Sequence, residues 1–142
     1  MIRTEVTLSA AHMVHTDEES KCYRMHGHNW KVILELDGKI QEDGMIVDFN
    51  DIKEYLNQMD HNVWIPTPRK HCEKLTEYFK MFDKYGDCIQ LPVPVITCEV
   101  VVKFLLQQFK KRWPHLTYVK ITLYESEKSY AMAKWDVMEL IK

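Results

Sequence analysis

The sequence predicts one α+β domain in which helices cover one face of an antiparallel sheet. Side chains alternate with a period of two near both ends of the chain, and apolar residues recur at helical spacing in two stretches between them. Turn signals containing glycine separate these stretches. The resulting order is strand, strand, helix, helix, strand, strand, which is typical of an α+β domain. A chain of 142 residues is long enough to bury a core of its own, so we expect a single domain spanning 1–142.

The first two strands are expected over 2–9 and 30–36, where residues that suit a buried face alternate with polar ones. Asp37-Gly38 is a turn signal that ends the second strand. An antiparallel pairing of the two strands would bring His12 to the same end of the sheet as His26 and His28.

The two main helices are marked by caps and apolar stripes. Asp48 or Asn50 can cap the first helix, and Thr97 can cap the second, which Pro114 ends. The expected buried faces are Ile52, Tyr55, Leu56 and Met59 in the first helix and Val100, Phe104, Leu105 and Phe109 in the second. Two further strands are expected over 119–125 and 129–137, which gives a four-stranded antiparallel sheet with two main helices on one face.

The segment from about 66 to 92 does not fit this scheme. Prolines bracket it, and residues 70–83 can form one amphipathic helix with Leu75, Phe79 and Phe82 facing inward. We interpret it as an insertion on the connection between the main helices, with no role that the sequence assigns.

Composition and charge exclude several classes of protein. Lysines and arginines number 19 and acidic residues 21, a net charge of −2, so there is no global positive field for nucleic acid. No apolar run approaches the roughly 18 residues that span a bilayer, and the start lacks the basic and then apolar regions of a signal peptide. The four cysteines form no Cys-x-x-Cys pair, which favours a reducing, cytoplasmic setting.

His26-Gly27-His28 is the centre of the candidate site. Two histidines at i and i+2 of a strand project from the same face, and Gly27 lets other groups approach the backbone closely. Neutral imidazoles suit zinc, with His12 as a third ligand; the alternative is an ordinary surface or core pair. Three histidines leave a tetrahedral zinc one open position, as a catalytic site needs.

Cys22 lies four residues before His26 and adds a nucleophile or a base. The flanking Lys21 and Arg24 favour its reactive thiolate form. Two alternatives remain open: Cys22 could be a fourth ligand that closes a structural zinc site, or an inert buried thiol.

Two further features can carry proton transfer and recognition. Asp60-His61 stands where the first helix is expected to end; it is either a helix-end capping pair or an imidazole held by a carboxylate for proton exchange near neutral pH. Glu125 ends the third expected strand and is either a solvated charge or an acceptor for two parallel N–H donors of a ligand.

In this order the features resemble the 6-pyruvoyltetrahydropterin synthase family, and most closely its 6-carboxytetrahydropterin synthases of the queuosine pathway. The resemblance covers the chain except the insertion, and it rests on Ser9-Ala10-Ala11-His12, Cys22-x-x-x-His26-Gly27-His28, Asp60-His61 and Glu125. It implies the tunnelling fold, whose subunits assemble into rings, typically hexamers, with active sites at subunit interfaces.

The resemblance also implies the roles of these residues. The zinc ligands would be His12, His26 and His28. Cys22 would be the catalytic cysteine, Asp60 and His61 the acid–base pair, and Glu125 the anchor of the pterin. Because Ile96 replaces a proline common in the family before Thr97-Cys98-Glu99, Thr97 and Glu99 are carried over only as pterin-binding candidates, and Lys21 and Arg24 as triphosphate-binding candidates.

The implied reaction converts 7,8-dihydroneopterin triphosphate to 6-carboxy-5,6,7,8-tetrahydropterin with release of acetaldehyde and triphosphate. The nearest alternative is a 6-pyruvoyltetrahydropterin synthase, which eliminates triphosphate without cleaving the side chain. An alternative of another class is a non-catalytic zinc protein that binds a pterin or purine; the set of Cys22, Asp60 and His61 argues against it, because binding alone does not require them.

Overall fold

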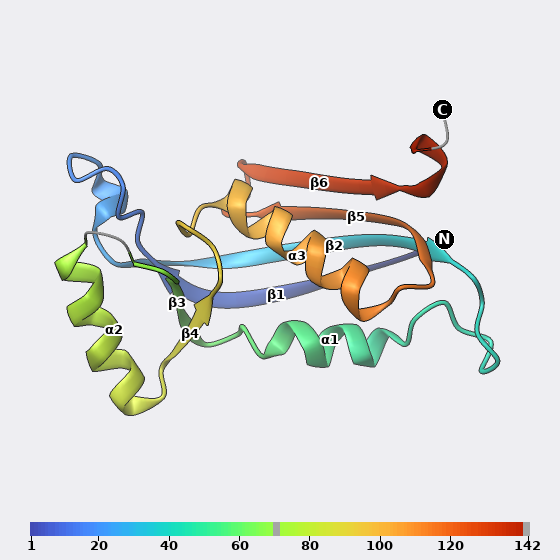
Figure 1. Cartoon of the computed structure of the whole chain (residues 1–142), viewed down its shortest axis with the longest axis horizontal. Helices are drawn as coiled ribbons and strands as arrows, with labels where there is room; N and C mark the ends of the chain where they lie inside the picture. Colours follow the sequence, from blue (N-terminus) through green and yellow to red (C-terminus); the bar gives the residue numbers. More distant parts are fainter. Residues whose placement is uncertain (70–71, 141–142) are drawn as a thin grey trace.

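A six-stranded mixed sheet forms the body of the protein (Figure 1), in a computed structural model that describes residues 1–69 and 72–140. The strand order is β4-β3-β1-β2-β5-β6. The strands are β1 (Ile2–His12), β2 (His26–Gly38), β3 (Asn62–Pro66), β4 (Cys88–Leu91), β5 (Leu116–Tyr124) and β6 (Tyr130–Asp136). The α-helices are α1 (Phe49–Asn57), α2 (Glu73–Tyr85) and α3 (Cys98–Arg112), and short 3₁₀ turns lie at Lys21–Tyr23 and Val137–Glu139.

The four expected strands are β1, β2, β5 and β6, and each pairs antiparallel with its neighbour. The prediction of a four-stranded sheet is wrong in its count, because β3 and β4 extend the sheet beyond β1 through parallel pairs. These two strands have only five and four residues, too few for a period of two to stand out in the sequence.

Both main helices begin at the expected caps. The Asp48 carboxylate accepts the Asn50 N–H at 2.8 Å, and the Thr97 hydroxyl accepts the Val100 N–H at 3.4 Å. The buried stripe of α1 includes Ile52 and Leu56, as predicted. The expected stripe of α3 is partly wrong: Val100 and Phe104 are half-buried, and the buried residues are Cys98, Val101, Val102, Leu105, Leu106 and Phe109.

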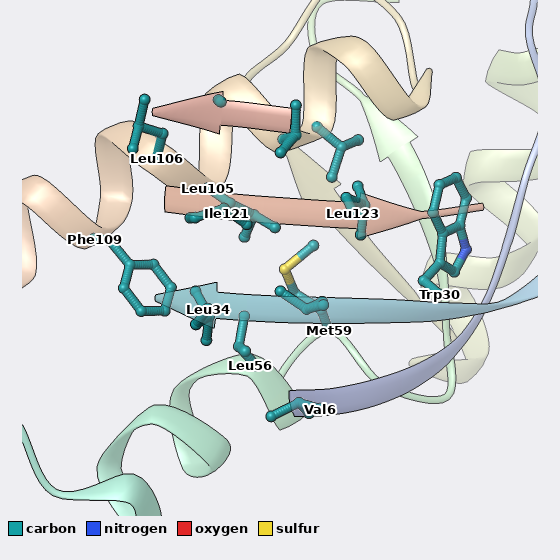
Figure 2. Close-up of a cluster of buried hydrophobic side chains, with 14 of the residues drawn as sticks. Val6, Trp30, Leu34, Leu56, Met59, Leu105, Leu106, Phe109, Ile121 and Leu123 are labelled. Carbon is teal, nitrogen blue, oxygen red and sulfur yellow. The ribbon is translucent and has the colours of Figure 1, made fainter. Parts of the chain in front are cut away.

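The main core lies between the sheet and the two helices α1 and α3 (Figure 2). Leu34 and Ile121 project from β2 and β5 toward Phe109 of α3, and Leu56 of α1 joins them from the other side. Trp30, fully buried, lies at the end of this core nearest the three histidines. Because both helices bury apolar stripes against the same sheet face, the arrangement predicted from the sequence is confirmed.

Helix α2 lies on the opposite face of the sheet. Along β3, Trp64 belongs to the main core, whereas its neighbours Val63 and Ile65 pack in a second cluster with Leu75 of α2. Residues 70–71 of the expected helix lie outside the described part of the chain, and α2 continues past Asp83 to Gly86, whose φ of 71° gives the left-handed cap. The segment from about 66 to 92, expected as an insertion, contains α2 and also contributes β4 to the sheet. No helix in the described ranges is long and apolar enough to cross a membrane.

Candidate active site

Pairing of β1 with β2 brings the three histidines together. His12 lies opposite His26 in the register, and Ala10 lies opposite His28, so the three rings share one end and one face of the sheet. The ring centroids are 4.6 Å apart for His12 and His26, 5.2 Å for His12 and His28, and 4.9 Å for His26 and His28. The convergence expected from the spacing is therefore present.

Backbone carbonyls orient two of these rings. Nδ1 of His12 lies 2.8 Å from the carbonyl oxygen of Ile96, and Nδ1 of His26 lies 2.6 Å from that of Arg24. A carbonyl only accepts, so each Nδ1 carries the proton and donates it. Each Nε2 is then left with a lone pair available to a metal, the arrangement that commonly orients a ligating histidine. The sequence gives no sign that Ile96 orients His12, because the contact is made by its backbone carbonyl and not by its side chain.

Glu125 completes the cluster. Its Oε1 lies 3.1 Å from Nε2 of His28 and 3.5 Å from Nε2 of the fully buried His12. Burial lowers the pKa of His12 to about 4, although the hydrogen bond to Ile96 opposes the shift, and burial also lowers the pKa of His28. Both rings are therefore neutral near pH 7, and these contacts are not ion pairs. Lone pairs on the His12 ring and on the carboxylate face each other.

A cation fits between these atoms. One ligand atom from each of His12, His26, His28 and Glu125 lies within 4.8 Å of the others. Among the described residues, Nε2 of His12 and of His28 are buried without a hydrogen-bond partner. Imidazole nitrogen and carboxylate oxygen are both zinc ligands, so the donor set suits zinc. Glu125 is therefore a fourth potential ligand, where the sequence analysis expects three histidines and one open coordination position.

The Asp60 carboxylate forms hydrogen bonds with β1 and with His61. One carboxylate oxygen accepts the Ser9 N–H at 2.7 Å, and the other lies 2.8 Å from Nδ1 of His61. The Ser9 N–H is the main cause that lowers the pKa of Asp60, with His61 adding to it. His61 donates its own N–H to the Ser9 carbonyl at 2.7 Å and has a φ of 54°, unusual for a residue other than glycine. The Asp60 carboxylate therefore contacts β1 and the His61 ring, and it does not cap α1, which ends at Asn57.

An open cavity of about 570 Å³ connects the two parts of the site. His28 and His61 both line it, and Asn29 and Asn62 add polar groups that the sequence analysis does not anticipate. Gly27 also lines it; a Cβ there would lie 3.6 Å from the nearest chain atom, so the approach of another backbone segment does not require glycine.

Cys22 lies on the 3₁₀ turn of the loop between β1 and β2 and is half-buried. Its N–H donates to the Ser20 hydroxyl at 3.1 Å, and its carbonyl accepts the Val14 N–H at 2.8 Å. Its thiol is not in the group of metal-ligand atoms, so the geometry gives no support to Cys22 as a fourth ligand. The neighbouring Lys21 and Arg24 are exposed.

The start of α3 adds two candidates for ligand binding. Thr97 caps the helix, and Glu99 is exposed in its first turn. Between them, Cys98 is buried, its thiol donates to the Leu123 carbonyl at 3.0 Å, and burial raises its pKa to about 11. Cys98 is therefore a packing residue.

Comparison with known proteins gives the family of this chain. The family model described as 6-pyruvoyl tetrahydropterin synthase matches residues 1–135. A putative 6-carboxy-5,6,7,8-tetrahydropterin synthase of Pyrococcus abyssi is 27% identical over 134 residues, covering 86% of this chain and 82% of the relative. The 6-pyruvoyl tetrahydrobiopterin synthase of Homo sapiens is 25% identical over 147 residues, covering 95% and 91%.

The fold is shared with solved structures. A 6-pyruvoyltetrahydropterin synthase of Plasmodium vivax aligns with a TM-score of 0.68 at 21% identity, over 95% of this chain and 98% of that one. The tunnelling fold and the family expected from the sequence are both confirmed. The chain therefore belongs to the 6-pyruvoyl tetrahydropterin synthase family of enzymes.

Proposed function

We propose that this protein converts 7,8-dihydroneopterin triphosphate to 6-carboxy-5,6,7,8-tetrahydropterin, releasing acetaldehyde and triphosphate, as a step of 7-deazapurine (queuosine) biosynthesis. The observation that carries the proposal is the convergence of three histidine rings beside a cavity that His61 also lines. Within the family, the Pyrococcus abyssi relative is named for the carboxylated product.

The proposed metal is zinc, held by His12, His26 and His28. In support, the Nδ1–H groups of His12 and His26 donate to backbone carbonyls, which leaves a lone pair on each Nε2 for a metal. When bound, zinc would supply Lewis-acid stabilisation of negative charge on the side-chain oxygens of the substrate.

Cys22 and His61 are the proposed proton-transfer groups. Cys22 would take a proton from the substrate side chain as its thiolate. His61 would exchange protons through Nε2, because Asp60 holds its Nδ1 at 2.8 Å. The His61 side chain is 83% exposed in the single chain, which leaves it available to a site shared with a neighbouring subunit in the expected ring.

Glu125 is the proposed anchor of the pterin. A pterin presents two parallel N–H donors, and a carboxylate accepts both at once. Since Oε1 of Glu125 lies beside His28, the side chain would have to turn from the histidines to the pterin when substrate binds. Thr97 and Glu99 would assist in holding the pterin, and Lys21 and Arg24 would contact the triphosphate.

The second candidate is the pyruvoyl reaction, which the similarity to the human enzyme favours. The spacing in the chain favours the carboxy product: three residues separate Cys22 from His26, as in the 6-carboxytetrahydropterin synthases that the motif resembles, whereas the animal pyruvoyl enzymes have a longer spacer. A shift of about 1 Å in a catalytic group can change a rate on the order of a hundredfold, so two residues of loop can change which bond is addressed. The hexameric assembly implied by the resemblance and the cytoplasmic setting favoured by the cysteine pattern remain predictions.

Product analysis tests the proposal. The purified protein is incubated with 7,8-dihydroneopterin triphosphate, and acetaldehyde, triphosphate and pterins are quantified. We expect acetaldehyde and the carboxylated tetrahydropterin in equal amounts, with both formed much more slowly by Cys22→Ala. Triphosphate released with pyruvoyltetrahydropterin and no acetaldehyde would establish the second candidate instead.

A further inference from the structure

Helix α2 is the part of the fold to which the family reaction assigns no role. It lies at the end of the sheet where the site forms (Figure 1). Its neighbours are β3 and the loop between β1 and β2 that carries Cys22.

The loop and α2 share one small hydrophobic core. Met13 of the loop is buried with Ile65, Cys72 and Leu75, and the half-buried Tyr23 and Met25 pack against them. Tyr23 and Met25 stand on either side of Arg24, in the short segment that joins Cys22 to His26. The apolar side chains of the loop therefore pack in the same cluster as Leu75 of α2.

Lys74 makes the polar contact between the two. Its Nζ donates to the backbone carbonyl of Tyr23 at 3.2 Å and lies 4.2 Å from the centre of the Tyr23 ring. A cation over an aromatic face is attracted to it, and the contact strengthens when water is excluded. Burial and the neighbouring Cys72 thiol raise the pKa of Tyr23, so its ring stays neutral beside Lys74.

Tyr23 directly follows Cys22, and the backbone of Cys22 is held on its other side. Ser20 accepts the Cys22 N–H at 3.1 Å, and Val14 donates to the Cys22 carbonyl at 2.8 Å. Three successive backbone groups are therefore held: the Cys22 N–H by Ser20 of the same turn, the Cys22 carbonyl by Val14 just after β1, and the Tyr23 carbonyl by Lys74 of α2. The position of the thiol relative to the histidines depends on all of them.

We propose that α2 is a positioning element for Cys22, and that Lys74 is the residue through which it acts. This inference rests on the proposed catalytic role of Cys22. Lys74 touches neither substrate nor metal in this account; it fixes the turn from which Cys22 reaches the reacting atoms, where a small displacement is costly.

The test compares three variants. Lys74→Met removes the donor and the charge and keeps the length of the side chain. Lys74→Arg keeps a charged donor, and Lys80→Met removes an exposed lysine of the same helix. Hydrogen exchange of the peptide covering 16–25 reports on the turn directly, and kcat and KM for dihydroneopterin triphosphate report on catalysis.

We expect Lys74→Met to speed exchange at Cys22 and Tyr23 by about tenfold, as a locally loosened segment does. Its kcat should fall by about ten- to a hundredfold with KM little changed. Lys74→Arg should restore most of both, and Lys80→Met should match the wild type. Zinc content and the thermal midpoint should stay close to wild type in all three.

Wild-type exchange in Lys74→Met, or a normal kcat despite faster exchange, would overturn the inference. So would failure of Lys74→Arg to restore either quantity. If the wild type itself does not turn over the substrate, the proposed function fails, whereas the exchange data still show whether α2 holds the turn.

Discussion

Oε1 of Glu125 lies 3.1 Å from Nε2 of His28, but the contact is not an ion pair, because the His28 ring is neutral near pH 7. Burial lowers the pKa of His28, so the ring is neutral, and the carboxylate faces the metal-ligand cluster. Glu125 is thus within reach of the metal position and is also the residue proposed to anchor the pterin. These two roles predict different consequences of one substitution.

The substitution Glu125→Gln distinguishes the role of pterin anchor from that of metal ligand. As a pterin anchor, the change replaces an acceptor oxygen by a donor facing an N–H, and a hydrogen bond to a charged group is worth about 1.5–3 kcal/mol, so KM should rise by about 10- to 100-fold. Zinc content should stay near wild type. An unchanged KM would count against Glu125 as the anchor, and loss of zinc would make it a ligand.

Cys22→Ala should keep the metal and the fold and lose most turnover. Its thiol lies outside the group of ligand atoms, so zinc content should be unchanged. Removal of a general base typically costs about 10²- to 10⁴-fold in rate, here expected in kcat. Metal analysis and steady-state kinetics check both parts. Release of zinc from this variant would instead identify the thiol as a ligand.

Asp60→Asn should reduce the dependence of stability on acid pH. The pKa of Asp60 is lowered in the fold, first by the Ser9 N–H, so the folded state binds the proton less readily than the unfolded chain. This contribution to stability is complete above the unfolded pKa, near 3.8, and is lost as pH falls through the folded pKa. An asparagine at this position does not titrate, so the variant does not lose this part of the stability as pH falls.

The measurement is the free energy of unfolding in urea from about pH 2 to 6, with a chelator present throughout so that zinc release does not contribute. Glu127→Gln, in the exposed turn between β5 and β6, serves as the control and should keep the wild-type slope. Parallel profiles for Asp60→Asn and the wild type would contradict the role of the Ser9 contact.

Gly38→Ala should destabilise the sheet where β2 meets β5. A Cβ at Gly38 would lie 2.7 Å from the His115 carbonyl oxygen and 2.9 Å from the Leu116 Cα, and both are backbone atoms that cannot turn aside. Overpacking of this kind costs about 1–3 kcal/mol. Gly27→Ala is the matched control in the zinc-free protein, since its Cβ would meet only the Ala10 carbonyl at 3.6 Å. Equal thermal midpoints for the two variants would refute the prediction.

The sequence could predict the long elements because their pattern is repeated many times. β1 and β2 have 11 and 13 residues, so their alternation predicts the strands, and the expected antiparallel pairing brings His12 to the same end of the sheet as His26. The exact register of His12 with His26 comes from the structure. β3 and β4 are too short to show a period, and their parallel pairing depends on neighbours distant in the sequence.

The site was less predictable than the fold in three respects. The Ile96 carbonyl that orients His12 carries no side-chain signal. The direction of the Glu125 side chain toward His28 depends on where β5 ends relative to β2. The contact between Lys74 and Tyr23 joins segments 51 residues apart, and nothing in either segment indicates the other.

The zinc content of the purified protein and of its histidine variants tests the central claim most directly. The account predicts about one zinc per chain, and loss of most of it in His12→Ala, His26→Ala and His28→Ala, because removal of one ligand of three destroys the geometry of the site. His115→Ala, which removes a histidine whose Nε2 contacts the Ile46 carbonyl, should keep the metal. Stoichiometric zinc retained in the three variants at 12, 26 and 28 would contradict the account.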